Sequence, residues 1–174
     1  MKIVIKGAGD LATGVAWELF REGHRIIMTE IAVPLTVRRQ VAYSRAVYER
    51  RAEVEGVTGV LAGSAEEAIA LSEQGVISVL VDPEARVREI WQPEVVIDAI
   101  MAKKNIGTTL TDAPLVLALG PGFSAGTDCH AVIETMRGEA LGRPIYRGSA
   151  IPNTGVPGMV GGYARERLIK ASGD

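Results

Sequence analysis

A glycine-rich segment near the amino terminus has the residue types and the spacing of a phosphate-binding turn. Residues 2–5 are β-prone and lead into a turn at Gly7 and Gly9, after which apolar residues recur with helical periodicity. These glycines occupy the first two positions of G-x-G-x-x-G/A, and Ala12, followed by Thr13, occupies the third. The sequence therefore predicts strand, tight turn and helix, with the N–H groups and positive dipole end of the helix open to an anion.

An acidic residue follows at the distance expected for ribose recognition. The next predicted strand, residues 25–29, ends at Glu30, about twenty residues beyond the glycines. A carboxylate there favours a free 2′-hydroxyl over a 2′-phosphate, which indicates NAD or FAD rather than NADP. The alternative is a plain βαβ unit whose glycines serve packing only.

Charged residues beside the turn have two interpretations each. Asp10 would repel a pyrophosphate, so we expect it to be the N-cap of the helix; the alternative is contact with a metal-bound phosphate or a ligand hydroxyl. Residues 35–48 are predicted to be helical and basic. Arg38 and Arg39 could bind phosphate or carboxylate through bidentate contacts, or could lie on a solvated helix face. Residues 49–56 are expected to form a loop that is mobile, with the arginine helix, when no ligand is bound.

Further candidates occur near predicted strands in the second half of the chain. Strands are expected at 57–61, 76–81, 95–97, 115–119 and 131–135, with an antiparallel return near 143–147. The candidate residues associated with them are Asp98, Asp112, Gly120, Gly122, Asp128 and His130. Because ligands bind outside the carboxyl edge of a parallel sheet, we expect these residues to share one cleft with the first glycine turn. The alternative is that residues 105–160 form a separate β lobe for protein contacts.

The alternation of apolar strands with helices predicts an α/β fold. We expect a Rossmann-like parallel sheet as a nucleotide-binding core over residues 1–104, and a mixed, β-rich C-terminal extension over 105–174 packed on the same domain. Cys129 is expected to be a small buried hydrophobe. With one Cys and two His, a zinc site of Cys and His is not expected.

Composition excludes several classes of protein. The 174 residues are 47% hydrophobic and 23% charged, with a net charge of −2, which is typical of a globular chain and gives no basic excess for nucleic acid. No apolar run reaches the roughly 18 residues of a membrane helix. The start at Met1 leaves no room for a signal peptide, and one Cys suits a reducing compartment, so a cytoplasmic location is expected.

Several stretches together resemble a known family, the YqeB-like accessory proteins of selenium-dependent molybdenum hydroxylase systems, which are related to the Rossmann domain of xanthine dehydrogenase accessory proteins. The matching stretches are 7–14, 28–31, 37–39, 98–100, 111–114, 120–134 and 148–155. The resemblance covers nearly the whole chain, and the 120–134 run is its most specific part. It also implies that family members continue beyond residue 174 into a small β-rich region, so the chain is expected to be truncated or a short relative.

This resemblance implies work on the insertion, sulfuration or storage of a molybdopterin-type cofactor, with a molybdenum hydroxylase as partner. The first functional hypothesis is therefore an accessory protein that binds a nucleotide or the pterin cofactor. An NAD-dependent oxidoreductase of a small molecule and a non-catalytic nucleotide sensor are the alternatives. Only His130, Lys103 and Lys104 lie where a proton donor for the oxidoreductase is expected. Contact between copies of the chain is a further option.

Overall fold

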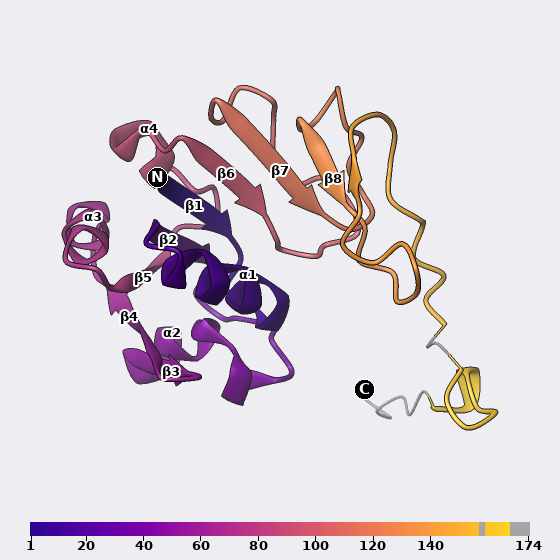
Figure 1. Ribbon diagram of the computed structural model, residues 1–174. Coiled ribbons are helices and arrows are strands. Elements are labelled where there is room, and N and C mark those ends of the chain that lie inside the picture. The colour runs from indigo at the N-terminus through magenta and orange to yellow at the C-terminus, as the bar shows by residue number, and fades with distance from the viewer. Residues whose placement is uncertain (157–158, 168–174) are drawn as a thin grey trace.

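The computed structural model describes residues 1–156 and 159–167, and it has the predicted α/β fold (Figure 1). Nine strands form one sheet: β1 (Lys2–Lys6), β2 (Arg25–Glu30), β3 (Arg51–Val54), β4 (Val57–Ala62), β5 (Ile77–Val81), β6 (Val95–Asp98), β7 (Leu115–Leu119), β8 (Ala131–Ile133) and β9 (Pro144–Ile145). The α-helices are α1 (Asp10–Arg21), α2 (Ala46–Glu49), α3 (Ala65–Glu73) and α4 (Val87–Trp91). Short 3₁₀ turns are η1 (Arg39–Val41), η2 (Tyr43–Arg45) and η3 (Arg165–Arg167).

The sheet is parallel except at its two edges. Its order is β3-β4-β5-β2-β1-β6-β7-β8-β9, and only β3 and β9 run antiparallel to their neighbours. From the central strand β1 the chain passes first to β2 on one side, and it later builds β6 to β9 on the other side. The strand order therefore reverses between β1 and β6, which is the point in such sheets where a crevice opens at the carboxyl edge.

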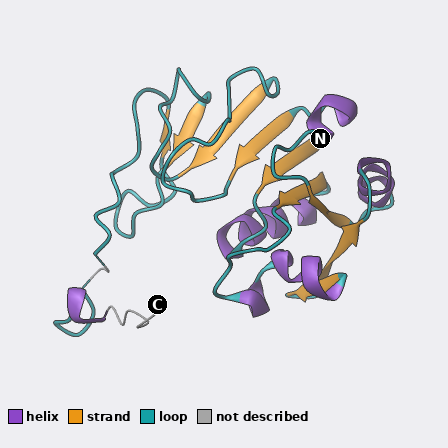
Figure 2. Ribbon diagram, turned by 180° about the vertical axis from the view of Figure 1, so that it is seen from behind, coloured by secondary structure: helices purple, strands orange, loops and turns teal. Residues whose placement is uncertain are grey.

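Each face of the sheet has its own apolar layer. On one face, α1, α2 and η2 pack over alternate strand residues such as Ile3, Ile5 and Met28. On the other face, α3, α4 and the loop that contains Phe123 cover residues such as Val4. Figure 2 shows that the helices gather around the half of the sheet that holds β1 to β5, whereas the connections around β6 to β8 are loops.

The local signals read from the sequence are mostly confirmed. The strand–turn–helix at residues 2–21 and the strand ending at Glu30 have the predicted form. Ser64 and Glu67 have the spacing of a capping box, which predicts a helix start there. In the structure the N-cap Ser64 accepts a hydrogen bond from the Glu67 N–H, and the Glu67 carboxylate accepts one from the Gly63 N–H. Cys129 is fully buried, as expected.

Two predictions between β2 and β4 are wrong. Residues 35–48 are not one helix; they form an irregular segment, two 3₁₀ turns and the single turn α2. The apolar side chains of Val33, Leu35 and Val37 are 65%, 83% and 95% exposed. This segment therefore packs no continuous apolar face on the sheet, and a helix there would gain no stability from packing. Residues 49–56 are not a loop, since β3 forms an antiparallel hairpin with β4.

The carboxyl-terminal residues are only partly described. The sequence predicts a turn-rich loop over residues 151–158 and a helix or strand over 163–170. Residues 151–156 form such a loop and η3 lies within the second segment, whereas 157–158 and 168–170 lie outside the described residues. Among residues 1–156 and 159–167, no helix has both the length and the apolar character needed to cross a membrane.

Candidate functional site

A cleft of about 350 Å³ opens at the carboxyl edge of the sheet, where the strand order reverses between β1 and β6. Its lining comes from three places: the glycine turn with the start of α1, the segment after β2, and the segment after β6. The lining residues are Gly7, Gly9, Asp10, Leu11, Glu30, Ile31, Leu35, Thr36, Val37, Arg38, Ala99, Ile100 and Met101. The glycine turn, Glu30 and Arg38 are thus brought together, whereas Arg39 is not among them.

The fold requires glycine at position 7 of the turn but not at position 9. Gly7 has φ +95°, and a Cβ there would lie 3.1 Å from Ala99 O, so the fold itself requires glycine at this position. Gly9 has an ordinary φ of −67°, and a Cβ would meet only Thr36 Oγ1 at 3.5 Å, which is a normal contact distance. Neither backbone conformation nor packing therefore explains the missing side chain at Gly9.

Gly9, and not Asp10 as the sequence suggested, is the N-cap of α1, and it provides no side-chain cap. The Gly9 carbonyl accepts the Thr13 N–H at 2.8 Å, which starts the helix one residue earlier than expected. Asp10 lies in the first helical turn and forms an ion pair with Arg38. The carboxylate that would repel a phosphate is therefore neutralised by an arginine on the rim of the same cleft.

The Glu30 carboxylate is held against the glycine turn. It accepts the Ala8 N–H at 3.0 Å and the Ile31 N–H at 2.8 Å. A carboxylate has about four acceptor positions, so two bonds of this kind fix its orientation and leave capacity for ligand hydroxyls. Glu30 is thus a preorganised acceptor beside the glycine turn.

Three predicted site residues lie outside the lining of the cleft. Ala12 is fully buried on the core-facing side of α1. Thr13 donates its hydroxyl to Ala8 O and accepts the Tyr43 N–H at 2.9 Å, so it ties the turn to η2. Arg39 lies 5.2 Å above the Tyr48 ring and lines a different surface hollow.

Asp98 is an internal ion-pair partner and does not line the cleft. Its carboxylate is 1% exposed, lies 3.6 Å from Lys6 Nζ and accepts the Thr108 hydroxyl at 2.5 Å. Lys6 Nζ also contacts Thr108 Oγ1, and the Ile100 N–H donates to the other Asp98 oxygen. This buried cluster anchors the 105–108 turn to the ends of β1 and β6.

The expectation of one shared cleft is wrong for three other residues. Asp112 pairs with Arg88 of α4 and lines a separate hollow on the α4 side. Asp128 accepts the Ser124 N–H at 2.7 Å and closes a turn. His130 directly precedes β8 and accepts the Val116 N–H at 2.9 Å. Because β8 runs parallel to β7, His130 lies beside the start of β7, at the amino edge of the sheet and away from the cleft.

The second glycine turn lies at the expected edge but serves packing. A Cβ at Gly122 would lie 2.5 Å from Lys104 N, and one at Gly120 would lie 2.7 Å from Thr135 Oγ1; both glycines have positive φ. Pro121 between them lines a second hollow of about 570 Å³, which shares Leu11 and Met101 with the first cleft. The two hollows therefore adjoin at Leu11 and Met101 along the carboxyl edge.

The second hollow contains residues that the sequence analysis missed. It is lined by Leu11, Met101, Pro121, Thr135, Met136, Arg137, Ile151, Asn153, Thr154 and Val156. Residues 135–137 follow β8, so the rule that ligands meet the carboxyl ends of strands would have pointed to them. Within the described residues, no group of three or more His, Cys, Asp and Glu side chains is arranged to hold a metal ion.

Buried Glu134 organises this second hollow. Its carboxylate, in a residue only 2% exposed, accepts the backbone N–H groups of Thr135, Met136 and Ile151, each at 2.8 Å. Burial alone would raise the pKa of Glu134, but these backbone hydrogen bonds lower it below its ordinary value. The charged carboxylate thus joins the two segments that form the wall.

Comparison with known proteins gives one informative relative and two negative results. The chain is 50% identical over 169 residues, 97% of its length, to the protein named "Uncharacterized protein YqeB" of Escherichia coli (strain K12). The chain spans about a third (31%) of that relative's length. No family model matches, and no solved structure matches. The identity supports the YqeB-like resemblance of this segment.

Proposed function

We propose that this chain binds the nucleotide part of a cofactor in the cleft at Gly9, and that it does so as an accessory protein in the maturation of a selenium-dependent molybdenum hydroxylase. The first part rests on the site, and the second rests on the sequence resemblance. An ADP-type group would have its phosphates at the N-terminus of α1 and its ribose hydroxyls beside Glu30. A molybdopterin-type cofactor that carries a nucleotide would use the same seat.

One observation carries the nucleotide proposal: Gly9 lacks a side chain where the fold would accept one. Serine, aspartate and asparagine are better N-caps than glycine when nothing else is bound there. A glycine with φ −67° and room for a Cβ, at an uncapped helix start in a cleft, is explained by close approach of a ligand to the backbone. The fixed Glu30 carboxylate and the Arg38 guanidinium fit the two ends of such a group.

The cleft is less suited to the oxidoreductase alternative. Hydride transfer coupled to an alcohol or acid substrate needs a proton donor or acceptor near the reacting atoms. The lining of the first cleft, within the described part of the chain, has Asp10 and Glu30 as acids but no His, Lys, Tyr or Ser. Both acids already hold partners there. Binding without redox chemistry is therefore the function that the site supports best.

The test is calorimetric titration of ADP into the parent protein, Gly9→Ser and Gly14→Ser. Gly14 is an exposed residue of the same helix with nothing within 4 Å of an added Cβ, so it is the matched control. Gly9→Ser should keep or slightly raise thermal stability through a new N-cap, by a few tenths of a kcal/mol, because serine caps better than glycine. It should weaken ADP binding at least about tenfold, which corresponds to about 1.4 kcal/mol.

Equal affinities of the three proteins for ADP, or no binding by the parent, would overturn the nucleotide proposal. The hydroxylase proposal has its own readout with the same variants. In cells that lack this protein, Gly14→Ser should restore molybdenum hydroxylase activity and Gly9→Ser should restore less of it.

A further inference from the structure

We infer that the second hollow is the seat for the distal half of the ligand, and that it selects a ring or group that accepts hydrogen bonds or carries negative charge. This inference rests on the proposed nucleotide site in the first cleft and names the class of ligand: a flavin- or pterin-type nucleotide in preference to one with a cationic nicotinamide ring.

The two adjoining hollows together make a groove whose length suits an elongated ligand. The first cleft lies over the ends of β2, β1 and β6, and the second hollow continues over the ends of β7 and β8 through the shared residues Leu11 and Met101. These five strands are consecutive neighbours in the sheet, so the groove spans four strand spacings, about 19 Å. A mononucleotide would fill only one end of it.

The arginine and amide groups of the second hollow are available as donors. Arg137 is exposed on the rim and makes no ion pair with any described residue. The Asn153 amide oxygen already accepts the Gly155 N–H, which leaves its NH₂ group to donate. No Asp or Glu is part of the described lining, and the Glu134 carboxylate behind it already accepts three backbone N–H groups, so a cationic ring would meet an arginine and no carboxylate of the lining.

The apolar part of the lining suits a flat ring. Leu11, Met101, Met136, Ile151 and Val156 surround the hollow, and methionine side chains adapt to and contact aromatic rings favourably. The wall is fixed before a ligand arrives, because Glu134 joins the end of β8 to Ile151 through its backbone hydrogen bonds. Preorganisation of this kind reduces the entropy lost on binding.

From the sequence, Asp98 and Asp112 are candidate residues of this region, and acids gathered there would suit a ligand that has hydrogen-bond donors at this end. Asp98 and Asp112 are held elsewhere by Lys6 and Arg88. The lining of the second hollow has no acid; its polar side chains are an arginine, an asparagine and two threonines. The ligand's distal half should therefore accept hydrogen bonds.

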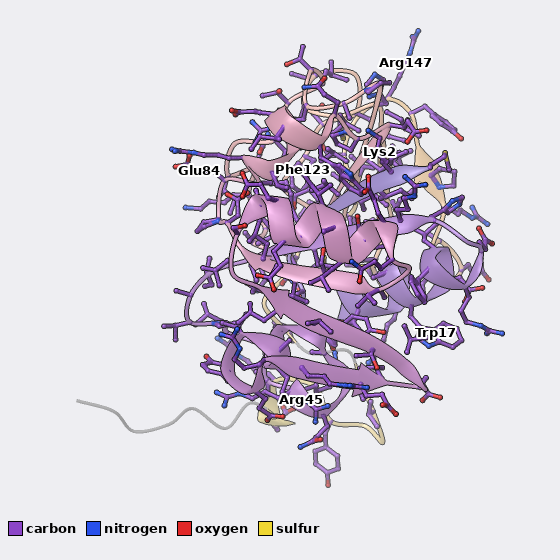
Figure 3. The ribbon with its side chains drawn as sticks, turned by 90° about the vertical axis from the view of Figure 1, so that its left-hand side faces the viewer. Lys2, Trp17, Arg45, Glu84, Phe123 and Arg147 are labelled. Carbon is purple, nitrogen blue, oxygen red and sulfur yellow. The ribbon has the colours of Figure 1, made fainter. Side chains whose placement is uncertain are left out.

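The experiment is calorimetric titration of FAD, FMN, NAD⁺ and ADP into the parent, Arg137→Gln and Arg147→Gln. Arg147 is the matched control, since it projects outward from the molecule (Figure 3) and does not line the hollow. We expect FAD to bind the parent at least about tenfold more tightly than ADP and NAD⁺ to bind no more tightly than ADP. Arg137→Gln should weaken FAD about ten- to a hundredfold, as expected for a lost charged hydrogen bond, and leave ADP unchanged.

The FMN arm separates this inference from the nucleotide proposal. If ADP fails to bind but FMN binds and loses affinity in Arg137→Gln only, the nucleotide proposal fails and the second seat stands. If ADP binds and neither FAD nor FMN depends on Arg137, the second seat is overturned and the first stands. If neither flavin binds the parent more tightly than ADP does, or if NAD⁺ binds as tightly as FAD, the proposed selectivity is likewise overturned.

Discussion

Lys6 and Asp98 form a buried pair whose removal should reveal how strongly the cleft is braced. The two side chains are 4% and 1% exposed, and their charged atoms lie 3.6 Å apart with the Thr108 hydroxyl between them. Asp98→Leu would leave the Lys6 ammonium with a hydroxyl as its only partner. Removing one member of a buried pair costs about 3–5 kcal/mol. For a domain of this size, that corresponds to a fall in Tm of roughly 6–20 °C.

Replacing the other member of the pair, Lys6, should lower the free energy of unfolding by less. In Lys6→Met the Asp98 carboxylate keeps two donors, the Thr108 hydroxyl and the Ile100 N–H. The double variant Lys6→Met/Asp98→Leu buries apolar groups in place of both charges, and such replacements are often neutral or stabilising. We therefore expect the double variant to be more stable than Asp98→Leu alone, with a coupling free energy of about 2 kcal/mol or more.

Urea denaturation followed by circular dichroism measures these differences for the four proteins. Glu84→Gln is the control, because it breaks the Glu84–Arg86 ion pair, whose side chains are 68% and 72% exposed, and should change stability little. Figure 3 shows Glu84 directed into solvent. Additive losses in the cycle, or an Asp98→Leu variant as stable as the parent, would refute the bracing role of this pair.

Two further predictions concern buried groups. Burial, with Asp128 and Asp98 nearby, raises the pKa of Cys129 to about 11, so iodoacetamide at pH 8 should modify the native thiol only as fast as the protein opens; rapid labelling without unfolding would contradict this. Glu134→Gln should lose about 1–3 kcal/mol at pH 7, because an amide NH₂ replaces an acceptor of a backbone N–H. The pKa of Glu134 is lowered in the folded protein, so its carboxylate stabilises the fold fully above the unfolded pKa of about 4.3. This contribution is lost as the pH falls below that value toward the lowered pKa of the folded state. The stability difference between the parent and Glu134→Gln, measured by urea titration, should therefore be smaller at pH 3.5 than at pH 7. A constant difference between the two pH values would refute the role of the charge.

The first half of the site could be predicted because its signals are local. Gly7, Gly9 and Ala12 lie within one turn of chain, and Glu30 ends the next strand, so pattern and spacing were sufficient. The sequence could not show that Gly7 is needed by the fold while Gly9 is not, since this depends on where Ala99 and Thr36 pack.

The part of the candidate site near β7 and β8 was predicted less well, for a topological reason. Residues that follow a parallel strand reach the carboxyl edge, as Pro121 does after β7 and Arg137 does after β8. Asp112 and His130 instead precede β7 and β8, so the connections carry them away from that edge. Thr135 and Arg137 also follow a parallel strand, β8, so the same strand-end rule predicts that they lie at this edge.

Long-range partners were beyond any local pattern. Thr108 lies 102 residues from Lys6, yet its hydroxyl joins the lysine to Asp98. Asp98 has the sequence position of a ligand-binding acid, but this contact makes it part of the interior. An acid at a strand end therefore does not indicate a site when a buried cation pairs with it, as Lys6 does with Asp98.

The central claim is that a nucleotide meets the backbone at the start of α1, and ¹H–¹⁵N chemical-shift mapping with ADP tests it most directly. The account predicts the largest shifts at the amides of Gly9, Asp10 and Leu11, with smaller ones at Ile31 and Ile100 across the cleft. In Gly14→Ser these shifts should saturate at the same ADP concentration as in the parent, and in Gly9→Ser they should need at least about tenfold more ADP. Saturable shifts confined to another surface, such as the hollow at Arg88 and Asp112, or no shifts at Gly9–Leu11 at millimolar ADP, would contradict it.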